Sequence, residues 1–289
     1  MTCSTSEITL ELPHLRLAAR VWGPEDGLPV LALHGWLDNA ASFEGLAPLL
    51  PGCRIVALDH AGHGLSAHRK HSTYYVLDYV ADALAAAAAL GWSRYAMLGH
   101  SLGAGVAALC AGTYPERVTR LALIEGFAPL ADDPEKAASR LRTALDREAR
   151  GSRQNTAPYA SIDDAARART RATGLPHEAA KTLVKRALEA VEGGWRWRTD
   201  ARLRWPSRVR LSEAQIRSFL SAIRCPVRAI RAENGPSFNE SSLAEHRACV
   251  RDLEVVKLAG GHHLHLEDPR CVAAVLAPFL AGPVTTAHS

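Results

Sequence analysis

Short apolar runs alternate with amphipathic stretches along most of the chain. Apolar and polar residues alternate over 7–22, with Pro13 between two halves, which predicts two antiparallel strands at a sheet edge. Helical patterns cover 74–90 and 101–113. Interleaved strands and helices predict βαβ units, and therefore a mostly parallel sheet with helices on both faces. Further apolar runs typical of buried strands lie at 29–33, 54–58, 95–98, 118–124, 225–230 and 253–258.

The middle of the chain has a different pattern. Strand signals are missing from about 130 to 215, where amphipathic helical patterns predominate. Between 131 and 217 there are 19 Lys and Arg against 12 Asp and Glu, an excess of seven basic residues. We therefore expect an α/β core formed by 1–128 and 218–289, with a basic helical insertion at 129–217. The basic residues have two interpretations, a solvated helical surface or a wall that recognises an acidic or acyl-linked substrate.

Composition narrows the class of protein. The chain has 289 residues, is 47% hydrophobic and 22% charged, and carries a net charge of only +4, which is ordinary globular composition. The net charge gives no case for nucleic-acid binding. The six cysteines include no CxxC pair, and neither a signal peptide nor an apolar run of membrane-spanning length is visible. We expect a cytoplasmic protein with reduced thiols and no membrane partner, whose oligomeric state the sequence leaves open.

A nucleophile motif provides the first indication of chemistry. Gly99-His100-Ser101-Leu102-Gly103 follows an apolar run and begins a stretch of small residues. This is the G-x-S-x-G pattern in the strand–turn–helix context that exposes a serine on a tight turn. Ser101 is therefore the expected nucleophile.

A serine hydroxyl needs a base to remove its proton. The last predicted strand is followed by Gly260-Gly261-His262-His263-Leu264-His265. Because the two glycines allow this loop to approach the serine closely, His262 is the expected base. His263 and His265 are interpreted as packing or supporting residues. Neither a metal ion nor an organic cofactor is implied, since no carboxylate or cysteine spacing accompanies the three histidines.

Backbone amides are expected to stabilise the oxyanion. Leu102 supplies one, and Trp36, in the segment Leu33-His34-Gly35-Trp36 after a strand, supplies the other. Residues interpreted as contacting the substrate are His34, Gly35, His100, Trp195 and Trp197. The two tryptophans have an alternative role as packing residues, and their mixture with arginine is also found in nucleic-acid binding, which no accompanying binding fold supports.

These motifs together resemble a known superfamily. LALHGW, ALDHAGHGLSAH, GHSLGAGVA and GGHHLHLEDP occur in the order and spacing of the α/β-hydrolases, over about residues 8–281. The segment 193–198, GGWRWR, and the segment IEG are shared with the serine hydrolase-like proteins. The resemblance implies the α/β-hydrolase fold: a mostly parallel eight-stranded sheet flanked by helices, with a helical cap inserted after strand six. By the same resemblance Asp59 is a structural residue that binds turn amides. His60 and His63 are interpreted as residues that stabilise the loop or line the pocket.

The third member of the catalytic triad departs from the common pattern. The loop after strand seven usually carries an aspartate in this superfamily, whereas Asn234 stands at that place here. Glu125, at the end of strand six, is the preferred acid because some related esterases carry it there. Glu233 is the alternative acid, and the absence of a functional acid is a third possibility.

The resemblance implies a serine hydrolase that cleaves a carboxylic ester or related acyl compound through an acyl-enzyme intermediate. Its expected partner is a small acyl substrate. A thioesterase and a carbon–carbon bond hydrolase are alternatives that use similar groups. A catalytically weak ligand-binding protein is a further alternative, favoured only by Asn234.

Overall fold

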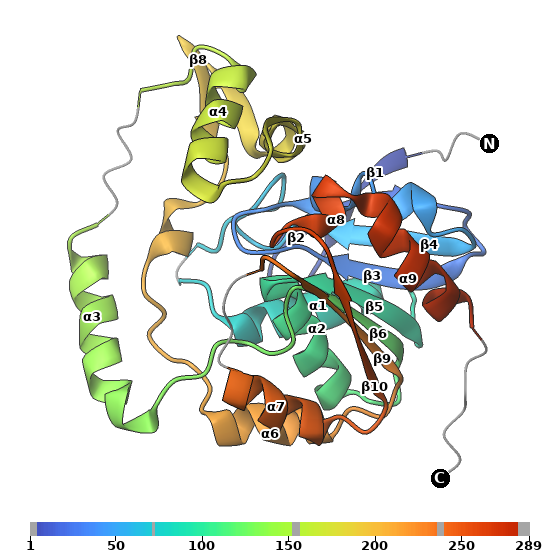
Figure 1. The fold of residues 1–289 in the computed structure, drawn as a ribbon. Coiled ribbons are helices and arrows are strands. Elements are labelled where there is room, and N and C mark those ends of the chain that lie inside the picture. Colours follow the sequence, from blue (N-terminus) through green and yellow to red (C-terminus); the bar gives the residue numbers. More distant parts are fainter. Residues whose placement is uncertain (1–4, 71–72, 152–156, 236–239, 283–289) are drawn as a thin grey trace.

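A computed structural model describes residues 5–70, 73–151, 157–235 and 240–282 (Figure 1). Its main sheet has eight strands in the order β1-β2-β4-β3-β5-β6-β9-β10. The pairs β1–β2 and β2–β4 are antiparallel and all the others are parallel, which confirms the predicted mostly parallel sheet. The strands are β1 (Thr5–Glu11), β2 (Arg16–Trp22), β3 (Leu28–Leu33), β4 (Cys53–Leu58), β5 (Tyr95–His100), β6 (Val118–Ile124), β9 (Val227–Ala232) and β10 (Leu253–Leu258).

Helices cover both faces of this sheet, as Figure 1 shows. One face carries α1 (Val76–Ala89), α2 (Leu102–Thr113), α6 (Glu213–Ser221) and α7 (Glu240–Cys249). The other carries α8 (Leu264–Glu267), α9 (Pro269–Ala281) and two short 3-10 helices, η1 (Ala40–Phe43) and η2 (Ala47–Leu49). Among the described residues, no helix is both long and apolar enough to span a bilayer.

The central strands are mostly apolar because both of their faces are covered. In β3, Leu31 and Leu33 pack under α1 and α2, whereas Val30 and Ala32 pack on the side of α9. Successive residues of a strand point to opposite faces, so a buried parallel strand reads as a continuous apolar run. This is why the runs in the sequence located these strands.

The segment between β6 and β9 holds the remaining elements. These are η3 (Pro134–Lys136), α3 (Ala137–Ala149), α4 (Ile162–Thr173), α5 (His177–Ala187), β7 (Leu188–Val191), β8 (Gly194–Trp197) and η4 (Ala201–Arg204). In Figure 1, α4, α5 and β8 stand above one edge of the main sheet and α3 lies to the side. Helix α6 crosses the expected boundary at 217/218 and packs on α2 of the core.

The strands β7 and β8 are a correction to the expectation of helices alone. They form an antiparallel hairpin in which Val191 pairs with Gly194. The turn depends on Gly193 and Gly194, which have φ of 83° and 142°, a backbone region that glycine adopts at little cost. Four-residue strands are too short to leave a periodic signal in the sequence.

Candidate active site

Ser101 occupies a sharp turn between β5 and α2. Its backbone has φ 51° and ψ −114°, an unusual conformation for a residue with a side chain. Close backbone packing makes the turn possible: a Cβ on Gly103 would lie 2.0 Å from the carbonyl oxygen of Leu33, and one on Gly99 would lie 2.5 Å from Cα of Ala104. The two outer glycines of the motif are therefore required for space as well as for the turn.

Backbone strain is concentrated at one edge of the sheet. Among the described residues, three other than glycine have a positive φ, namely Leu37, Ser101 and Glu125. They follow β3, β5 and β6, whose carboxyl ends lie together because the strands are parallel. Strained residues persist where the surrounding structure holds them, and such residues cluster at functional sites.

His262 lies between Ser101 and Glu125. Its Nε2 is 3.0 Å from Oγ of Ser101, and its Nδ1 is 3.3 Å from Oε2 of Glu125. With a proton on Nδ1 facing the carboxylate, Nε2 is free to accept the serine proton. The histidine side chain is 30% exposed, whereas the Glu125 side chain is 1% exposed, so the base is accessible and its acid is not.

Glu125 is held by the strand that follows it in the sheet. Its own amide donates to the carbonyl of Ile230, and the amide of Ala232 donates to Oε1 at 2.5 Å. The loop after β9 leaves space for this carboxylate, since a Cβ on Gly235 would lie 2.2 Å from Oε2. Glu233, the alternative acid, is exposed on the same loop. Glu125 is thus the acid that the fold places against His262.

Two buried histidines contact the backbone of the loop that carries Trp36. Nδ1 of His34 lies 2.7 Å from the carbonyl of Gly35, and Nε2 of His63 accepts from the amide of Leu37. On the opposite side, Leu102 is the first residue of α2, and the first amides of a helix have no intrahelical acceptor. The amide of Leu102 directly follows Ser101 in the chain, and the Trp36 loop lies close to the same turn, since a Cβ on Gly35 would be 2.8 Å from Nδ1 of His100.

Three neutral imidazoles fill the space beneath this loop. His34, His60 and His63 are buried, with their rings in edge contacts. Burial lowers the pKa of His60 to about 3 and that of His63 to about 4. Burial and the neighbouring imidazoles lower the pKa of His34 well below its ordinary value. Nε2 of His34 accepts from the amide of His60, which requires the uncharged ring.

Asp59 lies beside these histidines and organises the same region. Its carboxylate accepts from the amides of Ala40 and Leu65, each at 2.7 Å. The guanidinium of Arg186, from α5, also bonds to both carboxylate oxygens at about 3 Å. This buried pair ties the inserted segment to the core.

Several residues expected to contact substrate are buried or pack against other parts of the protein. His34 and His100 are completely buried, a placement that does not support direct contact with a ligand. Trp195 and Trp197 pack with Tyr159 and α4 in a small core within the inserted segment. Their aromatic area stabilises this segment, which accounts for the motif without a ligand. Gly35 belongs to the Trp36 loop itself, and a Cβ there would be 2.8 Å from Nδ1 of His100.

Trp36 is the aromatic residue that the structure leaves open beside the site. Its side chain is 51% exposed, and its Nε1 donates to the carbonyl of Leu203 in η4. The same loop is contacted by α4, where Arg169 donates to the carbonyl of Leu37, and by α5, whose Leu183 carbonyl accepts from Asn39. Three parts of the inserted segment therefore meet the Trp36 loop.

Asp38 is a site residue that the sequence did not reveal. It is buried, its Oδ2 faces His100 and His263, and its Oδ1 is paired with Arg169. Burial alone would raise the pKa of Asp38, but pairing with both histidines and the charge of Arg169 hold it well below its ordinary value. The only signal in the sequence is an acid shortly after a strand, in the segment HGWLD.

Comparison with known proteins places this geometry in a family. A family model described as alpha/beta hydrolase fold matches residues 29–269. A serine hydrolase-like protein of Danio rerio is 31% identical over 97% of this chain and 90% of its own.

Solved structures agree with this assignment. A hypothetical protein from Pseudomonas aeruginosa PAO1 is 47% identical, with a TM-score of 0.90 over 96% of this chain and 99% of that one. The thioesterase domain from the curacin biosynthetic pathway is 26% identical, with a TM-score of 0.84 over 94% of this chain and 99% of that one. With its eight-stranded sheet and its serine turn after β5, this chain belongs to the alpha/beta hydrolase fold family, and its relatives include the serine hydrolase-like proteins.

Proposed function

We propose that this protein is a serine hydrolase that cleaves a carboxylic ester or a related acyl compound through an acyl-enzyme intermediate. The observation that carries the proposal is the chain of contacts from Ser101 Oγ to His262 Nε2, at 3.0 Å, and from His262 Nδ1 to Glu125 Oε2, at 3.3 Å. Such a chain provides a nucleophile, a base and an acid that orients the base.

In this mechanism Ser101 attacks the acyl carbon while His262 takes the hydroxyl proton. Glu125 fixes the tautomer of the imidazole and stabilises the imidazolium that forms. The amides of Leu102 and Trp36 stabilise the oxyanion. His262 then donates its proton to the leaving group, and water attacks the acyl-enzyme by the same route in reverse.

The segment 129–217 acts in this proposal as a cap over the site. Support comes from the contacts that α4, α5 and η4 make with the Trp36 loop. The half-exposed indole of Trp36 then forms part of the pocket wall and contacts the acyl or leaving group. A neutral acyl ester fits this wall better than a strongly charged one.

A thioesterase is the second candidate. It is favoured by the 26% identity to a thioesterase domain over nearly the whole chain. Both candidates share the nucleophile and differ only in the leaving group. The contact of Glu125 with His262 supports a functional acid in spite of Asn234, and therefore favours catalysis over a catalytically weak binding protein.

The test is labelling of the intact protein by a fluorophosphonate, which reacts with activated serines, together with a panel of p-nitrophenyl esters and matched acyl thioesters. We expect labelling and ester hydrolysis in the wild type, and the loss of both in Ser101→Ala. Loss of a triad serine lowers kcat on the order of 10⁶-fold in a well-studied serine hydrolase. Ser139→Ala is the matched control, because this serine is exposed and its hydroxyl donates to the carbonyl of the nearby Lys136.

The panel also separates the two candidates. Higher kcat/KM for thioesters than for oxygen esters of the same acyl group favours a thioesterase. If the wild-type protein is not labelled, or if Ser101→Ala keeps more than a tenth of the activity, the proposal is wrong.

A further inference from the structure

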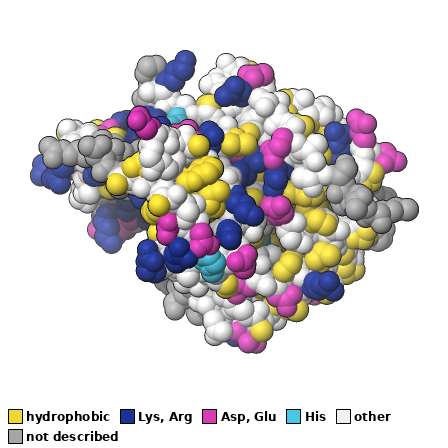
Figure 2. Space-filling model, turned by 90° about the horizontal axis from the view of Figure 1, so that it is seen from above, with side chains coloured by type: hydrophobic (Ala, Val, Ile, Leu, Met, Phe, Trp, Pro, Cys, Tyr) yellow, Lys and Arg dark blue, Asp and Glu magenta, His cyan; other side chains and the backbone are white. Residues whose placement is uncertain are grey.

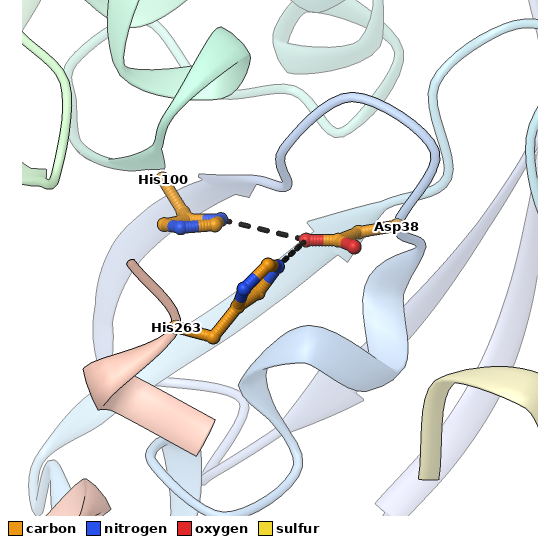
Figure 3. Close-up of side chains that lie close together, drawn as sticks. All are labelled: Asp38, His100 and His263. Carbon is orange, nitrogen blue, oxygen red and sulfur yellow. Dashed lines mark ion pairs between the residues drawn. The ribbon is translucent and has the colours of Figure 1, made fainter. Parts of the chain in front are cut away.

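Asp38, His100 and His263 form a second cluster beside the catalytic groups. Oδ2 of Asp38 is 3.5 Å from Nδ1 of His100 and 3.3 Å from Nε2 of His263. The three atoms all lie within 4.8 Å of one another, and Figure 3 shows both imidazole rings directed toward the carboxylate of Asp38. These side chains come from the loop after β3, the end of β5 and the loop before α8.

The hydrogen bond that His100 makes leaves its other ring nitrogen without a hydrogen. Its Nε2 is 2.9 Å from the carbonyl oxygen of His262, which can only accept, so Nε2 carries the hydrogen. The neutral ring then directs the lone pair of Nδ1 toward Oδ2 of Asp38. Within the described chain both atoms are buried without a hydrogen-bond partner. Two buried acceptors that face each other repel, and either a proton on Nδ1 or a bound cation removes that repulsion.

Two of the three separations between the ligand atoms suit a transition-metal ion. A tetrahedral zinc ion with bonds of about 2.0–2.1 Å separates its ligand atoms by roughly 3.3 Å. The two separations measured from Oδ2 are 3.3 and 3.5 Å. Imidazole nitrogens with one carboxylate are also a donor set that zinc accepts.

The surroundings complete the features of a metal site. Imidazole ligands of metals commonly donate their other N–H to a backbone carbonyl, and ligating carboxylates are themselves hydrogen-bonded. His100 donates to the carbonyl of His262, and Oδ1 of Asp38 accepts from Arg169. Because Arg169 already neutralises the one carboxylate, the site binds a cation weakly and fills only when the metal is abundant.

We propose that Asp38, His100 and His263 form a weak, reversible binding site for a divalent transition-metal ion, and that an ion bound there slows hydrolysis. The proposed inhibition follows from the way that these ligands are connected to the catalytic histidine. His263 is the neighbour of His262 in the chain, and His100 bonds to the carbonyl of His262. Drawing these two rings toward a metal shifts the backbone that carries the base, whose Nε2 must stay about 3 Å from Ser101. The inhibitory effect rests on the proposed hydrolase function, whereas the binding site does not.

Binding is measured first, without any substrate. The metal-free full-length chain is titrated with Zn²⁺ by calorimetry and with Co²⁺ by visible absorption, which reports tetrahedral nitrogen and oxygen ligands. We expect one site per chain, and at least tenfold weaker binding in His263→Gln and in Asp38→Asn. His177→Gln is the matched control. His177, on α5, pairs with Asp163 at 2.8 Å, so this variant should leave metal binding unchanged.

Arg169→Gln distinguishes a metal from a proton at this place. Removing the competing guanidinium frees the charge of Asp38, so Zn²⁺ affinity should rise several-fold. If the cluster serves only as a protonated support for the His262 backbone, the wild type shows no binding at millimolar Zn²⁺, and the proposal is overturned. Should Asp38→Asn not fold, the Arg169→Gln and His263→Gln results decide the question.

Hydrolysis is measured second. Added Zn²⁺ should lower kcat for a p-nitrophenyl ester, a chelator should restore it, and the inhibition midpoint should shift with binding in His263→Gln. Binding that persists in His263→Gln but disappears in His262→Gln would place the ion on the catalytic histidine and overturn the proposed site. Equal Zn²⁺ affinity in every variant would also overturn the proposed site. So would a thiolate-to-cobalt absorption band, which would place the ion on Cys249 or Cys271. Binding without inhibition would refute the inhibitory effect alone.

Discussion

Gly235→Ala is a single-methyl test of how closely the acid must be placed. A Cβ at this position would lie 2.2 Å from Oε2 of Glu125, 2.8 Å from its Cδ and 3.0 Å from Oε1. Gly235 is not among the glycines with positive φ, so alanine adds no backbone strain. The substitution therefore acts through the carboxylate alone.

The size of the effect follows from these distances. Oε2 must withdraw by about 1 Å to reach ordinary van der Waals separation, whereas it now lies 3.3 Å from His262 Nδ1. A displacement of about 1 Å in a catalytic arrangement can lower the rate on the order of 10²-fold, or about 2.7 kcal/mol in activation free energy. Complete loss of the acid sets the upper limit near 10⁴-fold.

The assay is kcat for the best p-nitrophenyl ester, with circular dichroism to verify folding. Gly282→Ala is the control, because the nearest atom to its added Cβ is 3.5 Å away. The double variant with Glu125→Gln should lose no more than the worse single variant, since both changes act on the same group. Wild-type kcat in a folded Gly235→Ala protein, or additive losses in the double variant, would refute this reasoning.

Three further predictions concern the acid, pH and the cap. Glu125→Gln should lower kcat by about 10²- to 10⁴-fold and Glu233→Gln should change it little; the reverse ranking would move the acid to the loop after β9. Because burial depresses the pKa values of His60 and His63, the unfolded chain takes up protons that the folded chain excludes below pH 6.5. The free energy of unfolding measured in urea should therefore be constant above this pH and fall by about 2 kcal/mol for each ring by about pH 5. The loss should be smaller in His60→Gln, and an equal loss in that variant would contradict the attribution to His60. Arg186→Leu should lower the free energy of unfolding by about 3 kcal/mol, because it leaves Asp59 buried without its cation, and a loss under 1 kcal/mol would show that the pair is dispensable.

Several arginines of the inserted segment are balanced by neighbouring acids. Arg140, Arg167, Arg196 and Arg208 are paired with acids of the same segment. Figure 2 shows basic and acidic side chains interspersed over the face seen from above. We expect kcat/KM of an anionic and a neutral ester to fall equally with salt, since mixed charges steer little. A steeper fall for the anionic ester would support recognition of an acidic substrate.

Local patterns made the strands and the serine turn predictable. The run 118–124 matches β6 to the residue, and G-x-S-x-G sets its own backbone requirements. Glu125 could be selected through the resemblance, because some related esterases carry the acid at the end of strand six. Asp38 could not, since its partners His100 and His263 lie 62 and 225 positions away in the sequence. Sequence spacing alone carries no information on such contacts.

The aromatic residues of the inserted segment show a different limit. Trp195 and Trp197 were expected at the substrate, yet they pack within the segment itself. A tryptophan near a predicted site is equally suited to a ligand and to a small core, because both environments bury the same apolar area. Which one it serves depends on where the β7–β8 hairpin stands, and two four-residue strands gave no sign of that hairpin.

The tight packing around Ser101 has a consequence for how this protein can change over evolutionary time. Gly99 and Gly103 touch neighbouring backbone so closely that any side chain would displace a strand or a helix. Selection should therefore remove substitutions at these two glycines, whatever the substrate. Trp36 and the surface-exposed parts of 129–217 are under no such steric restriction. New specificities should accordingly arise by substitution, insertion or exchange in that segment, with the serine turn inherited unchanged.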